Sequence, residues 1–229
     1  DGPMPGPARR AGAGASGRPG RSARPMSGYF ITLEGPEGSG KSSQARRLAG
    51  ALRRGGARVE FVRDPGSTAL GRALRNVLLH SGASLTPLTE ALLFIGGRVR
   101  LVEERIRPAL ARGRVVVCDR FHDSTVAYQG FGGGLDVPWL DRLGRRAIRG
   151  LMPDLTVLLD LPAERGLARL RRRRDRMEQK GLAFHRRVRA GFLRLARREP
   201  RRIVVVDASQ STEEVRRRIE ACVRQKLGR

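Results

Sequence analysis

The residues that most clearly could do chemistry form one short loop, Gly35-Pro36-Glu37-Gly38-Ser39-Gly40-Lys41-Ser42. This is the pattern G-x-x-x-x-G-K-[ST], in which glycines let successive backbone N–H groups point at phosphates. Lys41 adds a point charge, and Ser42 can hold Mg²⁺ at the start of a helix. An apolar run precedes the loop and a helical pattern follows it, as such a loop requires. The sequence therefore predicts a nucleoside triphosphate-binding site made of Gly35, Pro36, Glu37, Gly38, Ser39, Gly40, Lys41, Ser42 and Ser43.

A second group of polar residues follows two other apolar runs. Asp119 ends the run from Val115 to Cys118, where phosphoryl-transfer enzymes often place a carboxylate for Mg²⁺ or its water. Arg120 follows it, and Arg63 ends an earlier run. Two arginines facing an anionic cleft indicate that the acceptor is itself a phosphate. Its oxygen is already ionised at neutral pH, so the reaction needs charge neutralisation and in-line positioning rather than a side-chain base.

A dense cationic segment, Arg169 to Arg176, contains six arginines in eight residues. A solvated basic face is the usual reading of such a run. Here mutual repulsion would be costly unless an anion binds, which favours a lid over about 169–180 that closes on the phosphates. We expect Arg173 or Arg176 to reach the reacting groups.

The elements that must position these residues alternate along the chain. Short apolar, β-branched runs predict strands, and the longer patterns between them predict helices. Strands separated by helices indicate an α/β fold with a five-stranded parallel sheet flanked by helices on both faces. Ligands of such a sheet collect beyond the carboxyl ends of its strands, so the polar groups above should share one cleft. The predicted strands are 29–33, 58–62, 114–118, 155–160 and 203–207, and the predicted helices 41–54, 68–79, 86–111 with a break near Pro108, 137–149, 162–172, 178–198 and 211–226.

Length and composition indicate how many domains the chain has and where in the cell it is located. The chain has 229 residues and a hydrophobic fraction of 39%, enough for one domain over 28–229. Residues 1–27 contain no Leu, Ile, Val or aromatic side chain and are expected to be a disordered tail, with Met26 as a candidate natural start. Two cysteines without metal spacing, and the lack of a long apolar stretch, indicate a cytoplasmic protein without a membrane segment.

The formal charge of +25, from 47 basic and 22 acidic residues, raises the possibility of a nucleic-acid partner. The arginines are spread over the whole chain, however, and aromatic residues are only 4%. Stacking platforms for single strands are therefore sparse. We expect no specific nucleic-acid partner.

Taken together, several motifs resemble bacterial thymidylate kinase over nearly the whole chain from Tyr29. The most specific of them is Asp119-Arg-Phe-x-x-Ser-Thr-x-Ala-Tyr-Gln129. Within it, His122 matches no role in the family, and we expect it at the surface or in a dimer contact. The other motifs are Glu34-Gly-Pro-Glu-Gly-Ser-Gly-Lys-Ser42, Arg63-Asp-Pro-Gly66, Phe94-x-x-x-Arg98 and Asp175-Arg-x-Glu178.

The resemblance implies transfer of the ATP γ-phosphoryl group to dTMP, with Mg²⁺, by a P-loop kinase that forms a homodimer. It implies catalytic roles for Lys41, Arg120 and a lid arginine (Arg173 or Arg176), and metal binding by Glu34, Ser42 and Asp119. The thymine ring would lie on Phe94, with Arg98, Thr125 and Gln129 at its polar edge. Tyr128 would exclude a 2′-hydroxyl and Glu37 would accept from the 3′-hydroxyl. The implied substrate residues are Glu37, Arg63, Asp64, Phe94, Arg98, Arg120, Thr125, Tyr128 and Gln129.

The chain departs from the family pattern in two places. Asp64 and Ser67 replace a Glu and a Gly, and Gly96-Gly97 follows Phe94 where larger residues are common. Two alternatives remain open at this point: a kinase for dUMP or a deoxynucleoside on the same fold, and a nucleic-acid-dependent ATPase. A deoxynucleoside kinase would not need the second arginine for an acceptor phosphate. An ATPase would be expected to carry a water-positioning Glu where this chain has Arg120.

Overall fold

Five parallel strands form the centre of the structure, a computed structural model that describes residues 2, 28–80, 82, 84–170 and 175–228. The expected tail therefore lies, apart from Gly2, outside the described residues, as do arginines 171–174 of the expected lid. The strands run in the order β2-β3-β1-β4-β5. They are β1 (Tyr29–Glu34), β2 (Val59–Arg63), β3 (Val115–Asp119), β4 (Leu155–Asp160) and β5 (Ile203–Asp207).

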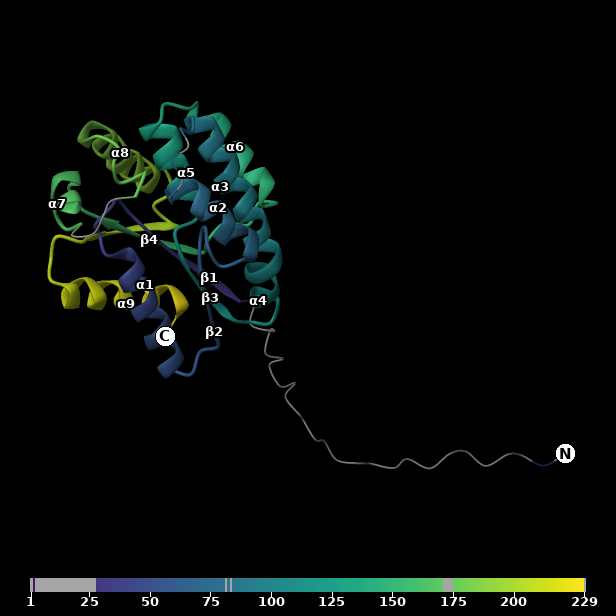
Figure 1. Cartoon of the computed structure of the whole chain (residues 1–229). Helices are drawn as coiled ribbons and strands as arrows, with labels where there is room; N and C mark the ends of the chain where they lie inside the picture. Colours follow the sequence, from purple (N-terminus) through teal and green to yellow (C-terminus); the bar gives the residue numbers. More distant parts are fainter. Residues whose placement is uncertain (1, 3–27, 81, 83, 171–174, 229) are drawn as a thin grey trace.

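Helices cover both faces of this sheet (Figure 1). Two of them, α1 (Lys41–Arg54) and α9 (Thr212–Leu227), pack on one face over a core that includes Ile31, Leu48 and Ile219. The remaining long helices gather on the other face, where β-branched and aromatic side chains such as Phe30 and Val116 are buried. This confirms the predicted fold class, because strands buried on both faces read as continuous apolar runs. The helices are α1 (Lys41–Arg54), α2 (Ala69–His80), α3 (Pro87–Leu101), α4 (Arg107–Ala111), α5 (His122–Thr125), α6 (Val137–Ala147), α7 (Ala163–Ala168), α8 (Leu182–Arg198) and α9 (Thr212–Leu227).

The carboxyl ends of the three strands β1, β2 and β3 lie level with one another. Asp119 of β3 pairs in register with both Leu33 of β1 and Arg63 of β2. The residues that follow these strands therefore emerge along one edge of the sheet, where a doubly covered parallel sheet places its ligands.

The predicted helices 162–172 and 178–198 are shorter in the structure, since α7 ends at Ala168 and α8 begins at Leu182. The helical segments differ further from the prediction in two places. The long segment predicted over 86–111 is interrupted before Pro108, by a π-helical stretch η1 (Val102–Ile106) rather than at the proline. Pro108 itself is the second residue of α4, which continues directly from η1. The sequence did not predict α5 and the π-helical segment η2 (Val126–Gly132). Almost all of η2 is buried on every side, so it carries no amphipathic period to detect.

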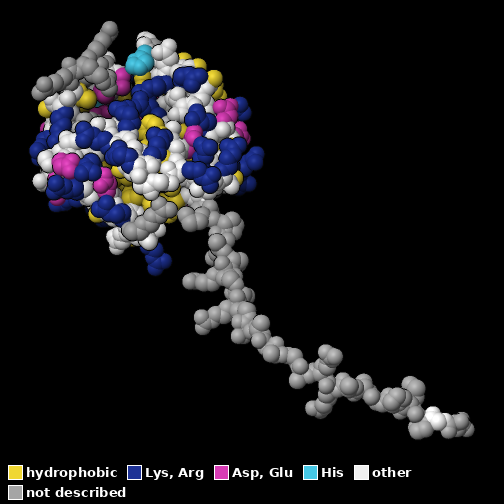
Figure 2. Space-filling model, turned by 90° about the horizontal axis from the view of Figure 1, so that it is seen from below, with side chains coloured by type: hydrophobic (Ala, Val, Ile, Leu, Met, Phe, Trp, Pro, Cys, Tyr) yellow, Lys and Arg dark blue, Asp and Glu magenta, His cyan; other side chains and the backbone are white. Residues whose placement is uncertain are grey.

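On the face seen in Figure 2, charged side chains are spread out rather than gathered in one patch. Figure 2 shows Lys and Arg side chains over the whole visible face, with Asp and Glu side chains between them. Several arginines of α9 pair with carboxylates one turn away, as Arg216 does with Glu213 and Glu220. Among the described residues, no helix is both long and apolar enough to cross a membrane.

Candidate active site

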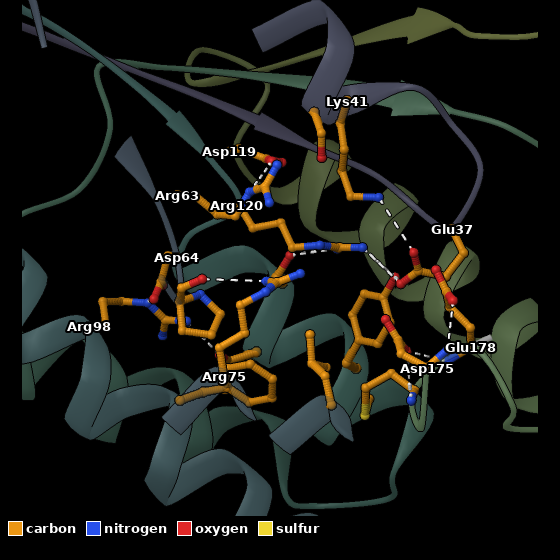
Figure 3. A pocket seen from close by; sticks show the side chains of 18 of the residues that line it. Glu37, Lys41, Arg63, Asp64, Arg75, Arg98, Asp119, Arg120, Asp175 and Glu178 are labelled. Atoms are coloured by element: carbon orange, nitrogen blue, oxygen red, sulfur yellow. Dashed lines mark hydrogen bonds and ion pairs between the residues drawn. The ribbon is translucent and has the colours of Figure 1, made fainter. Parts of the chain in front are cut away.

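A cavity of about 460 Å³ opens at the carboxyl edge of the sheet (Figure 3). It lies between the phosphate loop on one side and helices α2 and α3 with η2 on the other. The structure brings all of the predicted substrate residues to its wall. The lining includes Glu37, Lys41, Ser42, Arg63, Asp64, Arg75, Phe94, Arg98, Asp119, Arg120, Ser124, Thr125, Tyr128 and Gln129.

The phosphate loop is held in its curved form by glycines and by a close neighbour. Gly38 has a φ of 69°, and a Cβ atom there would lie 2.0 Å from the carbonyl oxygen of Gly166 in α7. Only glycine allows that approach. Lys41 Nζ donates to the Pro36 carbonyl at 2.9 Å, inside the loop. Burial, with Arg120 adding positive charge, lowers the pKa of Lys41 to about 8.

Arg120 occupies the middle of the cavity. Its backbone φ of 69° is unusual for any residue other than glycine. Its backbone N–H donates to the Leu33 carbonyl at 3.1 Å. The guanidinium donates to Glu37 Oε1 at 2.8 Å and to the Tyr128 hydroxyl at 3.1 Å. Burial alone would raise the pKa of Glu37, but Arg120 and Lys41 beside it hold that pKa at about 2. Glu37 is therefore an ionised acceptor in the cavity wall.

Asp119 faces the phosphate loop, and among the described residues only one of its two carboxylate oxygens accepts a side-chain hydrogen bond. Arg63 Nε donates to its Oδ2 at 3.0 Å. Its buried Oδ1 has no hydrogen-bond partner among the described residues. A buried carboxylate oxygen without a donor suits a cation or a cation-bound water. No cluster of three or more His, Cys, Asp or Glu side chains with metal-binding geometry occurs in the described part of the chain. A metal here would therefore also need Ser42, water or phosphate oxygens.

Arg98 dominates the far end of the cavity and is only 2% exposed. Its Nε donates to Asp64 Oδ2 at 2.5 Å and its Nη2 to Thr125 Oγ1 at 2.8 Å. Its buried Nη1 has no hydrogen-bond partner within the described residues. An unpaired buried guanidinium N–H costs free energy, which a carbonyl acceptor on a ligand would recover.

The two departures from the family pattern are accommodated locally. Asp64 reaches Arg98 despite its shorter side chain, and Ser67 Oγ accepts from the Arg63 backbone N–H at 2.7 Å. The helix α3 continues through Gly96 and Gly97 without interruption. A Cβ at Gly97 would come 3.2 Å from Leu74, so that glycine also permits close packing of α2 on α3.

Three expected positions differ in the structure. Glu34 was expected to bind metal, but its carboxylate is fully buried and accepts from the Phe121 and Ser124 backbone N–H groups and from Ser124 Oγ. With both oxygens used, Glu34 fixes the segment after β3 instead of facing the cavity. His122 was expected at the surface or in a dimer contact, yet it is 1% exposed, with Nε2 2.7 Å from Asp141 Oδ1.

The catalytic arginine of the expected lid is the third position that differs. Arg176 does not line the cavity, because its Nη1 donates to Glu90 at 2.7 Å and its Nε to the Leu78 carbonyl at 2.8 Å. These contacts hold its side chain against α2 and α3. The other candidate, Arg173, lies outside the described residues.

The buried carboxyl of Glu34 predicts a dependence of stability on pH. Burial, with Asp123 adding negative charge, raises the pKa of Glu34 to about 7. The folded state then binds more protons than the unfolded state, so the stability that Glu34 contributes is lost as pH rises from about 4.5 to about 7. Urea unfolding at pH 5 and pH 8 should show wild type losing up to about 3 kcal/mol relative to Glu34→Gln over that range. A pH-independent difference between the two proteins would contradict this assignment.

Sequence reasoning missed Arg75. This residue of α2 lines the cavity and points into it from the wall opposite Lys41 (Figure 3). Burial, together with Arg63 and Arg120 nearby, lowers its pKa. Three guanidinium groups, those of Arg63, Arg75 and Arg120, therefore line one cavity together with the carboxylates of Glu37 and Asp119. In a chain with 47 basic residues, one arginine on an amphipathic helix gives no signal of its own.

Comparison with known proteins places this geometry in context. A family model described as thymidylate kinase matches residues 33–219. The chain is 50% identical over 198 residues to a thymidylate kinase of Deinococcus radiodurans, covering 86% of this chain and 96% of that protein. It is 52% identical over 198 residues to one of Synechococcus sp. strain JA-3-3Ab, covering 86% and 96%. A solved structure of thymidylate kinase from Ehrlichia chaffeensis matches with a TM-score of 0.72 at 33% identity, covering 86% of this chain and 98% of that one.

Proposed function

Because the chain belongs to the thymidylate kinase family and phosphorylates dTMP with ATP in nucleotide biosynthesis, we propose that the cavity described above is its catalytic centre. The observation that carries this proposal is the convergence of Arg63, Arg75 and Arg120 opposite Lys41. Phosphoryl transfer between two phosphates brings several negative charges together, and fixed cations reduce that repulsion. A deoxynucleoside acceptor would give these three arginines no phosphate to neutralise.

We propose that dTMP lies along the cavity with its phosphate at the arginines and its base at Arg98. The unpaired Nη1 of Arg98 would donate to a base carbonyl, and Thr125 and Gln129 line the same end. Phe94 supplies an apolar surface for the ring. The sugar would then lie beside Tyr128 and Glu37. The Tyr128 hydroxyl donates to Glu37 Oε1 at 2.7 Å. Glu37, ionised at neutral pH, is suited to accept from a sugar hydroxyl.

ATP would bind with its phosphates on the backbone N–H groups of the phosphate loop. Lys41 lies buried at the start of α1 and would contact the phosphate that is transferred. We propose that Ser42 and Asp119 hold Mg²⁺, either directly or through water. Bound Mg²⁺ neutralises charge on the phosphate oxygens. The unpartnered Oδ1 of Asp119 supports this assignment, whereas the saturated carboxylate of Glu34 does not support a metal role.

The metal assignment predicts a defect that added Mg²⁺ relieves. Asp119→Asn should raise the Mg²⁺ concentration for half-maximal activity by about 10-fold or more, because one charged ligand or water-holding group is lost. ADP release with dTMP, measured across a Mg²⁺ titration, tests this. Asp160→Asn is the matched control, because Asp160 also ends a strand of the same sheet, β4, but does not line the cavity. An unchanged Mg²⁺ requirement in Asp119→Asn would refute the assignment.

We further propose that the protein is a homodimer that meets its partner through α3 and α6. Leu88 and Leu92 lie one turn apart on α3 and are 43% and 50% exposed, and Trp139 of the adjacent α6 is 40% exposed. Three large apolar side chains exposed on packed helices indicate a contact surface. A cytoplasmic location is also proposed, since Cys118 and Cys222 are free thiols and both substrates are nucleotides.

A single charge on this surface should separate the subunits. Leu92→Arg is expected to elute at the mass of one chain in size-exclusion chromatography with light scattering, whereas wild type elutes at twice that mass. Leu182→Arg serves as the control, since Leu182 is also an exposed leucine but belongs to α8, outside the proposed contact surface. A dimeric Leu92→Arg protein would exclude α3 from the interface.

A further inference from the structure

Glu90 is a fully buried carboxylate that none of the roles above explains. It lies in the first turn of α3 and is 0% exposed. Its Oε1 accepts from Arg176 Nη1 at 2.7 Å and from Lys180 Nζ at 3.0 Å. Its Oε2 accepts from Lys180 Nζ at 3.1 Å and from Gln129 Nε2 at 2.9 Å. Both carboxylate oxygens of Glu90 therefore accept hydrogen bonds, and one of the donors, Gln129, lines the cavity.

The contact with Glu90 fixes which end of the Gln129 amide faces which way. A carboxylate can only accept hydrogen bonds, so Gln129 must turn its NH₂ group toward Glu90. The amide oxygen is then the group left for the cavity that Gln129 lines. An uncharged neighbour such as a glutamine could donate or accept, and would allow the amide to rotate by half a turn.

That orientation bears on which pyrimidine the pocket accepts. Thymine presents an acceptor at O4 and a donor at its N3–H, whereas cytosine presents an amino donor and an unprotonated N3 acceptor. Arg98 offers donors, and a Gln129 amide held by Glu90 offers an acceptor. The pair thus matches the thymine edge, and the amide oxygen would oppose the N3 lone pair of cytosine. A site whose polar groups are left unpaired rejects the wrong base strongly.

We propose that Glu90 is a specificity-determining positioning residue, which holds the Gln129 amide so that its oxygen reads the N3–H of the base. This inference rests on the proposed placement of the base between Arg98 and Gln129. Glu90 does not itself line the cavity, so it acts through Gln129 rather than on the substrate.

The test is base selectivity, measured as kcat/KM for dTMP divided by kcat/KM for dCMP. Glu90→Gln should lower this ratio about 10-fold or more, a loss of about 1.4 kcal/mol in discrimination, with the KM for ATP unchanged. Glu90→Asp keeps the charge but shortens its reach, and should lower the ratio as well. It provides a second variant if Glu90→Gln does not fold.

Lys180→Met is the matched control, because it removes another donor from the same carboxylate without freeing Gln129. It should lower the melting temperature and leave the selectivity ratio unchanged. Gln129→Ala tests whether Gln129 contacts the base, separately from whether Glu90 orients it. If Gln129→Ala lowers the ratio but both folded Glu90 variants leave it unchanged, the role of Glu90 is overturned. If Gln129→Ala leaves both the ratio and the KM for dTMP unchanged, the placement of the base fails and the inference fails with it.

Discussion

Replacing Arg120 by alanine is expected to lower kcat/KM for dTMP by about 10³-fold or more, the range found for arginines that stabilise a transferring phosphoryl group. Two observations support an effect of this size. The guanidinium lies in the middle of the cavity, bound to Glu37 and Tyr128, and its backbone adopts a φ of 69° that fixes where the side chain begins. Its removal takes away a buried charge and also leaves the Glu37 carboxylate with one less cation.

Two further variants, Arg120→Lys and Arg107→Ala, show whether the loss of activity is specific to the Arg120 guanidinium. Arg120→Lys keeps the charge but loses the fork that contacts two partners at once, so it should recover only part of the activity. ATP binding, measured by calorimetry without dTMP, should stay within a few-fold of wild type. Arg107→Ala is the control, since Arg107 donates to the Ile148 and Arg149 carbonyls away from the cavity. An Arg120→Ala enzyme with near-normal kcat/KM would remove Arg120 from the reaction.

Lys41→Met is expected to lower kcat by about 10²-fold to 10³-fold, the usual loss when one preorganised electrostatic group is removed from a transition state. The KM for dTMP should change little, because Lys41 lies on the phosphate-loop side of the cavity. Single-turnover kinetics with saturating ATP would isolate the chemical step. A normal single-turnover rate would show that Lys41 serves another purpose, such as loop stability.

The same lysine gives wild type a pH dependence that the variant should lack. With its pKa lowered to about 8, Lys41 in the unliganded enzyme loses its proton as pH rises through that value. The kcat/KM for ATP, which reports ionisations of the free enzyme, should therefore fall above about pH 8 in wild type. The profile of Lys41→Met should be flat over the same interval.

The sheet was predictable because strands buried on both faces show continuous apolar runs. The runs at 29–33 and 203–207, for example, became β1 and β5 with little change. The cavity edge followed from the rule that parallel strands gather ligands at their carboxyl ends. The phosphate loop was predictable because each of its residues has a distinct physical task.

The errors arose where a residue type has two uses that only tertiary structure separates. An acidic side chain after a strand can bind a metal or accept backbone N–H groups, and Glu34 does the latter. His122 lies between Phe121 and Asp123 in the sequence, and packing of α6 against it, with Gly144 close to the ring, places it in the interior. Arg75 was missed because its helix shows only an ordinary amphipathic pattern. Contacts between distant segments decide all three cases.

The π-helical form of η2 has a consequence for which changes in chain length the protein can tolerate. Tyr128 and Gln129 are adjacent in sequence, and both line the cavity from a segment whose turns hold an extra residue. Deleting one residue from Val126–Gly132 would replace its wide turns by ordinary α-helical turns and change which of its side chains face the cavity. Tyr128 and Gln129 could then no longer both line the cavity. Natural variation and engineered libraries should therefore accept substitutions within η2 far more readily than single-residue insertions or deletions.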